Sequence, residues 1–255
     1  MKFIGIIPAR YESSRFPGKP LHLICGKSMI QRVYEQCKLA GVLDEIVIAT
    51  DDERIVQHVK GFGGNVVLTS ASHKCGTERC NEAISILNND GIYDNEDVVI
   101  NIQGDEPLIN PEQISLVSSC FNKKGVALAT LAKKISNSTD IFNPNTIKVV
   151  FNNFNEAVYF SRSPIPYQRG IIEKEWINSG NYYKHIGIYA YKVGMLKKIT
   201  KFAQTKLELS ESLEQLRWLE NGLIINVAIT EHDSHSVDVP EDVATIEEMI
   251  AKSFK

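Results

Sequence analysis

The sequence predicts a single α/β domain built on a mainly parallel β-sheet that helices cover on both faces. Three observations lead to this prediction. Short β-rich apolar runs alternate with amphipathic stretches through the first half, helix-capping residues stand between them, and 43% of the 255 residues are hydrophobic. Strands that alternate with helices pair in parallel through crossover connections. A chain of this length and hydrophobic content can bury a full core.

Four strand–helix steps fill the first half. The predicted strands cover 3–7, 45–49, 65–68 and 97–102, and the predicted helices begin near residue 28, cover 53–59 and 77–87, and resume after residue 110. Pro8 ends the first strand, Thr50-Asp51-Asp52 supplies caps for the second helix, and Asn110-Pro111-Glu112 opens the fourth. Sheets of this kind bind ligands beyond the carboxyl ends of their strands, so the residues that follow each strand are site candidates.

The second half predicts a smaller antiparallel insertion. Three β-rich runs follow one another at 127–131, 147–151 and 157–161, and residues 152–155 have the composition of a hairpin loop. We expect loops at 140–145 and 164–180, a strand at 185–191, one helix over 210–220, a strand at 224–229, and a last helix with Pro240 in its first position. The domain should therefore span 1–255, with a β-rich subregion at about 127–192.

Composition and charge exclude several classes of protein. The 28 basic and 31 acidic residues give a net charge of -3, without the broad basic field of a nucleic-acid binder. The apolar run before Pro8 is too short for a signal peptide or a membrane span, so we expect a cytoplasmic protein without membrane insertion. The five cysteines form no C-x-x-C pair, which favours reduced thiols, and a zinc site at His73, Cys75 and Cys80 is disfavoured.

A cationic loop follows the first predicted strand. Arg10, Arg15 and Lys19 would share a helix face, but the prolines and glycine at 17–20 oppose a helix. The cations should therefore line a loop at the carboxyl edge of the sheet, where arginine and lysine can bind a polyphosphate. The alternative is a solvated basic loop, and the rigid proline- and glycine-containing sequence favours a binding role.

Asp105 ends the most buried-looking predicted strand and should face the same crevice. Mg²⁺ prefers oxygen ligands, commonly one or two carboxylates with substrate phosphates, so a second acid is needed. Asp238 is the leading candidate, although an ordinary turn acid near a helix start explains it equally well. By spacing alone, Asp51 is a capping residue, His185 a strand histidine, and Glu214 and Gln215 the polar side of a helix.

Several segments together resemble the 3-deoxy-manno-octulosonate cytidylyltransferase family, also called CMP-Kdo synthetase, over nearly the whole chain. They are Ile7-Pro8-Ala9-Arg10, Arg15-Phe16-Pro17-Gly18-Lys19-Pro20-Leu21, Ala49-Thr50-Asp51, Gly76-Thr77-Glu78-Arg79, Asn101-Ile102-Gln103-Gly104-Asp105-Glu106-Pro107, Phe160-Ser161-Arg162, His185-Ile186-Gly187-Ile188-Tyr189, Leu213-Glu214-Gln215-Leu216-Arg217 and Val237-Asp238-Val239-Pro240-Glu241-Asp242. The resemblance implies a Rossmann-like nucleotide-diphospho-sugar transferase fold and transfer of CMP from CTP to 3-deoxy-D-manno-octulosonate (Kdo), with release of pyrophosphate, for lipopolysaccharide biosynthesis. It also implies a homodimer formed through the β-rich subregion.

The resemblance further assigns roles to residues. It implies catalytic roles for Arg10, Arg15, Lys19 and Asp105, and Mg²⁺ ligands at Asp105 and Asp238. It implies nucleotide contacts from Ala9, Arg10, Arg15, Lys19, Thr50, Cys75, Gly76, Thr77, Arg79 and Gln103. It implies sugar-acid contacts from Gln103, Arg162, His185, Tyr189, Glu214 and Gln215. Similar proteins usually have serine at the position of Cys75, and a thiol is a weaker hydrogen-bond partner than a hydroxyl.

Two other functions stay open at this point. A CMP-sialate-type synthetase would keep the reaction and change the sugar acid. A catalytically silent sugar-nucleotide-binding module would keep only the fold, although the presence of Asp105, Asp238 and every loop cation argues against it. The expected reaction is in-line attack of the anomeric hydroxyl on the α-phosphorus of CTP, driven by positioning and electrostatics.

Overall fold

The central sheet of the computed structural model, which describes residues 1–13 and 15–253, has the strand order β11-β7-β10-β6-β1-β4-β5. The strands are β1 Phe3–Ala9, β2 Leu23–Ile24, β3 Lys27–Ser28, β4 Glu45–Thr50, β5 Val66–Leu68, β6 Val98–Asn101, β7 Leu128–Lys134, β8 Lys148–Phe151, β9 Ala157–Ser161, β10 Tyr183–Lys192 and β11 Asn226–Ile229. The α-helices are α1 Met29–Leu39, α2 Glu53–Gly61, α3 Gly76–Leu87, α4 Pro111–Ser119, α5 Ser138–Phe142, α6 Trp176–Ser179, α7 Val193–Ile199, α8 Lys206–Glu211, α9 Glu214–Glu220 and α10 Asp242–Ser253.

The first half confirms the predicted parallel arrangement. β1 pairs in parallel with β4 on one side and with β6 on the other, and β4 pairs in parallel with β5. Strand β1 continues through Pro8 to Ala9, past the predicted end. A proline is tolerated there because β6 pairs only as far as Ile6, so Pro8 has a sheet neighbour on the β4 side alone.

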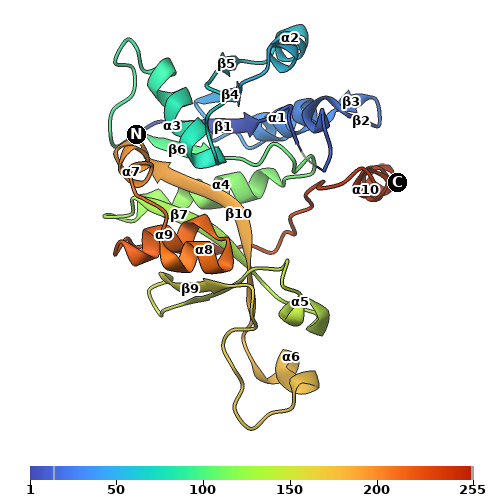
Figure 1. Ribbon diagram of the computed structural model, residues 1–255, viewed down its shortest axis with the longest axis vertical. Coiled ribbons are helices and arrows are strands. Elements are labelled where there is room, and N and C mark those ends of the chain that lie inside the picture. Colours follow the sequence, from blue (N-terminus) through green and yellow to red (C-terminus); the bar gives the residue numbers. More distant parts are fainter. Residues whose placement is uncertain (14, 254–255) are drawn as a thin grey trace.

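Helices cover both faces of the sheet, as predicted (Figure 1). The alternation of side chains along β1 sends Ile4 and Ile6 into a core shared with α3, α7 and α9. Ile7 lies in the opposite core, with side chains of α1, α2 and α4. The sheet is therefore buried on both sides, which leaves its carboxyl edge as the open side for a ligand.

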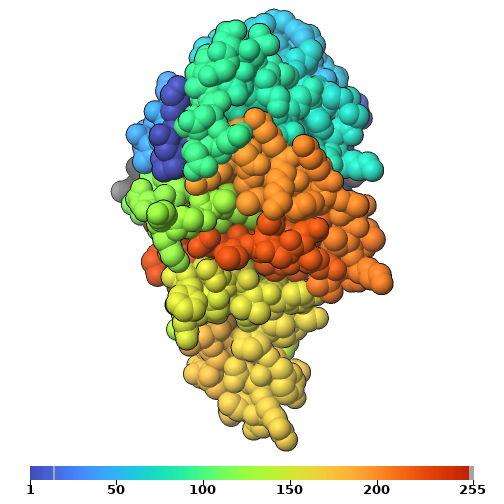
Figure 2. All heavy atoms as spheres, turned by 90° about the vertical axis from the view of Figure 1, so that its left-hand side faces the viewer, coloured from blue at the N-terminus to red at the C-terminus, as the bar shows by residue number. Residues whose placement is uncertain are grey.

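The antiparallel insertion is also confirmed. β10 runs antiparallel to both β6 and β7 inside the main sheet, and its first part pairs with β8, which forms a hairpin with β9. Figure 1 shows β9, α5 and α6 at one end of the molecule, far from α1 and α2, and Figure 2 shows this region, in yellow, as its narrow end.

Two segments expected to be loops contain short helices. α5 lies within the first, where the Asn137 side chain caps it by accepting the Asp140 amide at 2.8 Å. α6 lies within the second. Both form because Ile141 of α5 and Trp176 of α6 are buried together in a small apolar cluster with Tyr182. Such packing between distant segments overrides weak local propensity.

The single helix expected over 210–220 is two helices, and that prediction is wrong. Ser212 has φ +52°, in the left-handed region, and the next residue is extended, so α8 ends and α9 begins at Glu214. The last helix also begins later than predicted, at Asp242, with Pro240 two residues before it. Asp242 accepts the amides of Asp238 and Val239 at 2.7 and 3.0 Å, which ends the extended segment that leads into α10.

The last segment returns to the beginning of the chain. Val237 and three apolar residues of α10 form a cluster with Phe16, Ile24 and Met29, at the edge of the first loop. Val237 also donates its amide to the carbonyl of Asp105 at 2.9 Å. In the described part of the chain, no helix has the length and apolar character that crossing a membrane requires.

Candidate active site

A cavity of about 340 Å³ opens at the carboxyl ends of β1 and β6, the adjacent parallel strands of the sheet. Its lining contains six of the predicted site residues, namely Ala9, Arg10, Arg15, Lys19, Gln103 and Asp105. Pro8, Glu12, Ser13, Pro20 and Gly104 also line it and were not predicted. The position of this cavity follows from the topology, because the ends of neighbouring parallel strands meet at one edge.

The cationic loop closes on itself above the cavity. Gly18 has φ +73° and donates its amide to the carbonyl of Tyr11 at 2.9 Å, which reverses the chain before Lys19. A side chain other than hydrogen at this φ would be strained. Lys19 and Pro20 then form a short 3₁₀ turn. The bond between Gly18 and Tyr11 thus holds the part of the loop that carries Lys19, as the prolines and glycine indicated.

Two ion pairs join the predicted phosphate-binding cations to the predicted metal ligands. Lys19 Nζ lies 2.7 Å from Asp105 Oδ2 and donates to the carbonyl of Val237 at 2.9 Å. Arg15 pairs with Asp238 at 2.8 Å in a more exposed position. The structure therefore brings Asp238, from 133 positions further along the chain than Asp105, to the same site.

Gly104 follows β6 and lies close to the end of β1. A Cβ placed on it would be 2.6 Å from the carbonyl oxygen of Pro8, a distance that a backbone atom cannot accommodate without moving. Gly76, at the start of α3, is also close to β1, since a Cβ there would lie 3.2 Å from the Pro8 ring. The first turn of α3 is therefore a neighbour of the cavity, as the predicted roles of Gly76 and Thr77 require.

Thr50 and Arg79 occupy supporting positions behind the cavity. Both are fully buried. The carbonyl of Thr50 accepts the amide and hydroxyl of Thr69, at 2.7 and 3.1 Å, and Arg79 donates to Thr69 Oγ1 at 2.7 Å. This burial disfavours a direct contact between the Arg79 guanidinium and a nucleotide. Its role here is to hold the turns after β4 and β5 together.

The capping interpretation of Asp51 is wrong. Asp52, not Asp51, caps α2 by accepting the amide of Arg54 at 2.9 Å. Asp51 instead pairs with the buried Arg79 at 3.0 Å. Arg10 makes a further link across these turns, donating from its guanidinium to the carbonyl of His73. The guanidinium groups of Arg10 and Arg79 thus join the loops at the carboxyl edge.

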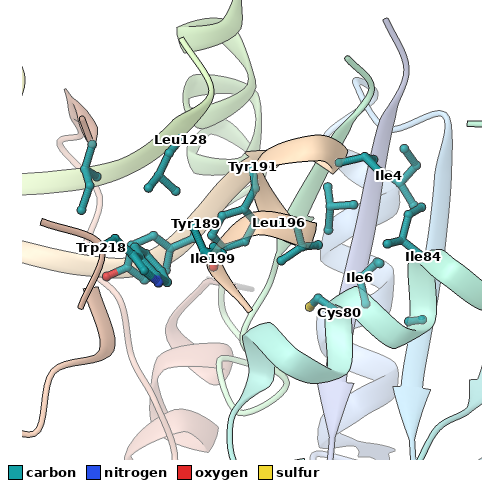
Figure 3. Close-up of a cluster of buried hydrophobic side chains, with 14 of the residues drawn as sticks. Ile4, Ile6, Cys80, Ile84, Leu128, Tyr189, Tyr191, Leu196, Ile199 and Trp218 are labelled. Atoms are coloured by element: carbon teal, nitrogen blue, oxygen red, sulfur yellow. The ribbon is translucent and has the colours of Figure 1, made fainter. Parts of the chain in front are cut away.

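The predicted sugar-acid residues gather around β10. His185 and Tyr189 lie side by side on this strand, with ring centroids 5.2 Å apart. Tyr189 packs edge-on against Trp218 of α9 at 5.1 Å (Figure 3), and its hydroxyl is buried without a hydrogen-bond partner in the described structure. Gln103 reaches β10 from the end of β6 and donates to the carbonyl of Gly187 at 3.1 Å.

Glu214, the first residue of α9, connects the predicted sugar-acid residues with the predicted nucleotide-binding residues. Its carboxylate accepts the hydroxyl of Thr77 at 2.8 Å and the thiol of Cys75 at 3.3 Å. Burial raises the pKa of Glu214, against the lowering effect of these two donors. Burial, followed by the Glu214 charge, also raises the pKa of Cys75 to about 12, so its thiol stays protonated and can donate.

Arg162 and Gln215 complete this set. Arg162 donates from Nε to the carbonyl of Glu211 at 2.6 Å and from Nη1 to that of Pro144 at 3.0 Å, so it ties the end of β9 to the corner between α8 and α9. Gln215 is buried at the second position of α9. The amphipathic pattern did not reveal the break at Ser212. Because of this break, α9 starts in a new direction and Glu214 points toward α3.

A mainly parallel sheet with cations and carboxylates at its carboxyl edge is typical of α/β enzymes that transfer nucleotidyl groups. A family model described as "Cytidylyltransferase" matches residues 4–229. Curated relatives named 3-deoxy-manno-octulosonate cytidylyltransferase include one from Parabacteroides distasonis, 56% identical over 95% of this chain and 96% of the relative. Another, from Bacteroides thetaiotaomicron, is 51% identical over 98% of both chains. The chain belongs to the 3-deoxy-manno-octulosonate cytidylyltransferase family, which confirms the resemblance seen in its motifs.

Solved structures agree with this assignment. A CMP:2-keto-3-deoxy-manno-octonic acid synthetase in complex with CTP superposes with a TM-score of 0.89 at 37% identity, covering 99% of this chain and 100% of the other. A cytidylyltransferase from Leptospira borgpetersenii shares the fold, with a TM-score of 0.64 at 17% identity over 99% of this chain and 87% of the other. The predicted fold class is thereby confirmed.

Proposed function

We propose that this enzyme transfers CMP from CTP to Kdo, producing CMP-Kdo and pyrophosphate for lipopolysaccharide biosynthesis. The observation that carries the proposal is the cavity at the ends of β1 and β6, which Arg10, Arg15, Lys19 and Asp105 line together. Three cations at one cavity suit a triphosphate, whose pyrophosphate leaves during the reaction. The identity to relatives of this name over nearly the whole chain supports the choice of sugar acid.

We further propose that Asp105 and Asp238 hold Mg²⁺. Their carboxylate oxygens are hard donors, and the hydrogen bond from the Val237 amide to the Asp105 carbonyl ties their two segments together. Two carboxylates suit an ion that completes its shell with substrate phosphates and water. Among the described residues, no group of three or more histidine, cysteine or acidic side chains could enclose a metal. When bound, Mg²⁺ would neutralise charge on the triphosphate.

The residues of the chain would then exchange partners on substrate binding. Lys19 and Arg15 form ion pairs with Asp105 and Asp238. A triphosphate offers these cations stronger bidentate or multiple contacts, and release of the two carboxylates leaves their oxygens free for the metal. Positioning of the sugar hydroxyl opposite the leaving pyrophosphate falls to the side chains around β10 and α9.

The test of the reaction is pyrophosphate release from CTP and Mg²⁺ with Kdo, with a sialic acid, or with no sugar. Release with Kdo alone is expected. Release with the sialic acid alone would keep the chemistry and replace the sugar. No release with either acid, together with tight CTP binding, would indicate a silent binding module and refute the proposal.

We also propose that the enzyme is a homodimer that works in the cytoplasm. The β-rich subregion exposes apolar side chains, with Val158 59%, Tyr167 74% and Ile172 55% accessible, and a partner subunit would cover them. All five cysteines are free thiols, which suits a reducing compartment. Light scattering at working concentration tests the assembly, and a monomer mass would refute it.

A further inference from the structure

Thr130, on β7, touches the predicted sugar-acid site without belonging to it. Its side chain is fully buried, and no role was assigned to it from the sequence. Its hydroxyl has three polar neighbours, namely Nε2 of His185 at 2.9 Å, the carbonyl of Ile188 at 2.7 Å and the carbonyl of Ile186 at 3.3 Å. Thr130 is therefore placed to act on His185 and not on a substrate.

These three neighbours decide which nitrogen of His185 carries the proton. A hydroxyl has one hydrogen to donate, and a carbonyl oxygen can only accept. With two carbonyls facing it, the Thr130 hydroxyl donates to one of them, and the closer is that of Ile188. The hydroxyl oxygen then accepts from His185, so Nε2 carries the hydrogen and Nδ1 has a free lone pair.

The same contacts fix an irregularity in β10. The pairing of β10 with β7 shifts register between Ile186 and Tyr189, where the strand has a β-bulge. Thr130 supplies a donor to the Ile188 carbonyl, and Gln103 supplies one to the Gly187 carbonyl at 3.1 Å. Bulges aim side chains in directions that a regular strand does not allow. His185 and Tyr189 flank this one.

The surroundings of His185 keep its ring neutral. Phe160 and Tyr189 pack against it with ring centroids 5.2 Å away in both cases. Burial lowers the pKa of His185 to about 3. At neutral pH the ring is thus one fixed tautomer, with one nitrogen that donates and one that accepts.

We propose that Thr130 is a positioning residue for the sugar-acid subsite: its hydroxyl holds His185 as the Nε2–H tautomer, so that Nδ1 accepts a hydrogen bond from a sugar hydroxyl. This proposal rests on the proposed function, because it assumes a polyhydroxylated acid beside His185. Thr130 acts through the histidine and through the bulge carbonyls, and makes no contact with the substrate itself.

The first test is steady-state kinetics of Thr130→Val, which keeps the shape of the side chain and removes its hydroxyl. Loss of one oriented hydrogen bond should raise KM for Kdo about fivefold to tenfold, with KM for CTP changed less than about twofold. Thr130→Ser should restore the wild-type KM. Thr200→Val is a matched control, since the Thr200 hydroxyl bonds to the carbonyls of Leu196 and Lys197 in the preceding helix α7.

The second test needs no substrate. Nitrogen-15 NMR of the wild-type enzyme should show a protonated Nε2 and an unprotonated Nδ1 for His185, and Thr130→Val should give a mixture of the two tautomers. A wild-type proton on Nδ1 overturns the proposal, and so does an unchanged KM for Kdo in Thr130→Val. If wild-type enzyme releases no pyrophosphate with Kdo, the proposed function fails, while the tautomer measurement still decides the role of Thr130 toward His185.

A double-mutant cycle separates this role from general stability. If Thr130 acts through His185, Thr130→Val should add no more than about twofold to KM for Kdo in a His185→Leu background, where residue 185 has no group that can bond to Thr130. Full additivity of the two effects would mean that Thr130 influences the site by another route, and would overturn the proposal. Should Thr130→Val fail to fold, the cycle is run with Thr130→Ala, and the wild-type NMR spectrum remains decisive.

Discussion

Lys19 Nζ and Asp105 Oδ2 are 2.7 Å apart, and the lysine is the less exposed partner of this ion pair, with 14% of its side chain accessible against 30% for the aspartate. A cation predicted to hold phosphate thus neutralises a carboxylate predicted to hold metal. The pairing keeps two opposite charges in place at a partly buried edge, where either one alone would be costly.

Asp105→Asn should reduce turnover by roughly a hundredfold or more while the fold stays intact, because an amide is a much poorer ligand for Mg²⁺ than a carboxylate. Pyrophosphate release with Kdo measures the rate, and circular dichroism measures the fold. Asp90→Asn, at an exposed position, should be as active as wild type. A near-normal rate in Asp105→Asn would remove the metal assignment.

Lys19→Gln should have opposite effects on two ligands. Without the ammonium beside it, Asp105 should bind Mg²⁺ alone a few-fold more tightly, whereas CTP should bind roughly tenfold more weakly for want of a phosphate contact. Isothermal titration calorimetry with each ligand separately measures both. If Mg²⁺ alone binds the variant no better than wild type, the competition between lysine and metal is absent.

The fold was predictable because its signals are local. The parallel half and the hairpin were indicated by apolar runs, capping residues and turn composition. These signals also indicated the edge of the sheet at which the cavity lies. The break at Ser212 was not predictable, because the leucine spacing around it suits a continuous helix. Helix α6 depends on Trp176 packing with residues such as Ile141, more than thirty positions away, which no local pattern reports.

Some residues of the candidate site were also predictable from local signals, and others were not. Arg10, Lys19 and Asp105 follow predicted strands, so topology alone placed them together. The convergence of Asp238 on Arg15 depends on where α10 packs, and spacing left it undecided. The roles of His185 and Glu214 came only from family motifs, since a histidine in a strand and an acid at a helix start have ordinary structural explanations.

Gly104→Ala should reduce turnover strongly, because the new methyl group would meet the Pro8 carbonyl and move the end of β1 away from that of β6. We expect a loss of about tenfold or more, since small displacements of catalytic groups are costly. Gly61→Ala is the matched control, because a Cβ at Gly61 has no neighbour within 4 Å and alanine favours the helix. Equal activity of the two variants would contradict this.

His185→Gln should flatten the acid side of the stability curve. The folded-state pKa of His185 is lowered to about 3, whereas the unfolded ring has an ordinary value near 6.5. The unfolded state therefore binds more protons in this window, and wild-type stability is full above about pH 6.5 and falls as pH drops toward 3.

Between about pH 6 and about pH 4.5, wild type should lose roughly 1 to 2 kcal/mol more than His185→Gln in urea unfolding. Glutamine can still donate to Thr130, so the comparison isolates the charge. His22→Gln, an exposed histidine, should follow wild type. Parallel curves for wild type and His185→Gln would show that His185 titrates normally.

Lys148→Met should destabilise the β-rich subregion. Lys148 is fully buried, and its ammonium donates to the carbonyls of Asn143, Thr146 and Arg162 at 2.8, 2.6 and 2.5 Å. Methionine would leave these acceptors without a donor, at a cost of roughly 2 to 4 kcal/mol in urea unfolding. Lys134→Met, at an exposed position, should cost less than about 0.5 kcal/mol. A similar small loss in both would show that Lys148 is not required.

The return of the last segment to the first loop has a consequence for synthesis of the protein. Asp238 reaches Arg15 only through an extended segment anchored by Val237 and α10 on Phe16 and Met29. Asp238 follows Arg15 by 223 positions, so during synthesis the cationic loop exists well before this carboxylate does. If Asp238 holds Mg²⁺ as proposed, a chain interrupted before Asp238 would carry the loop cations and Asp105 but only one of the two carboxylates.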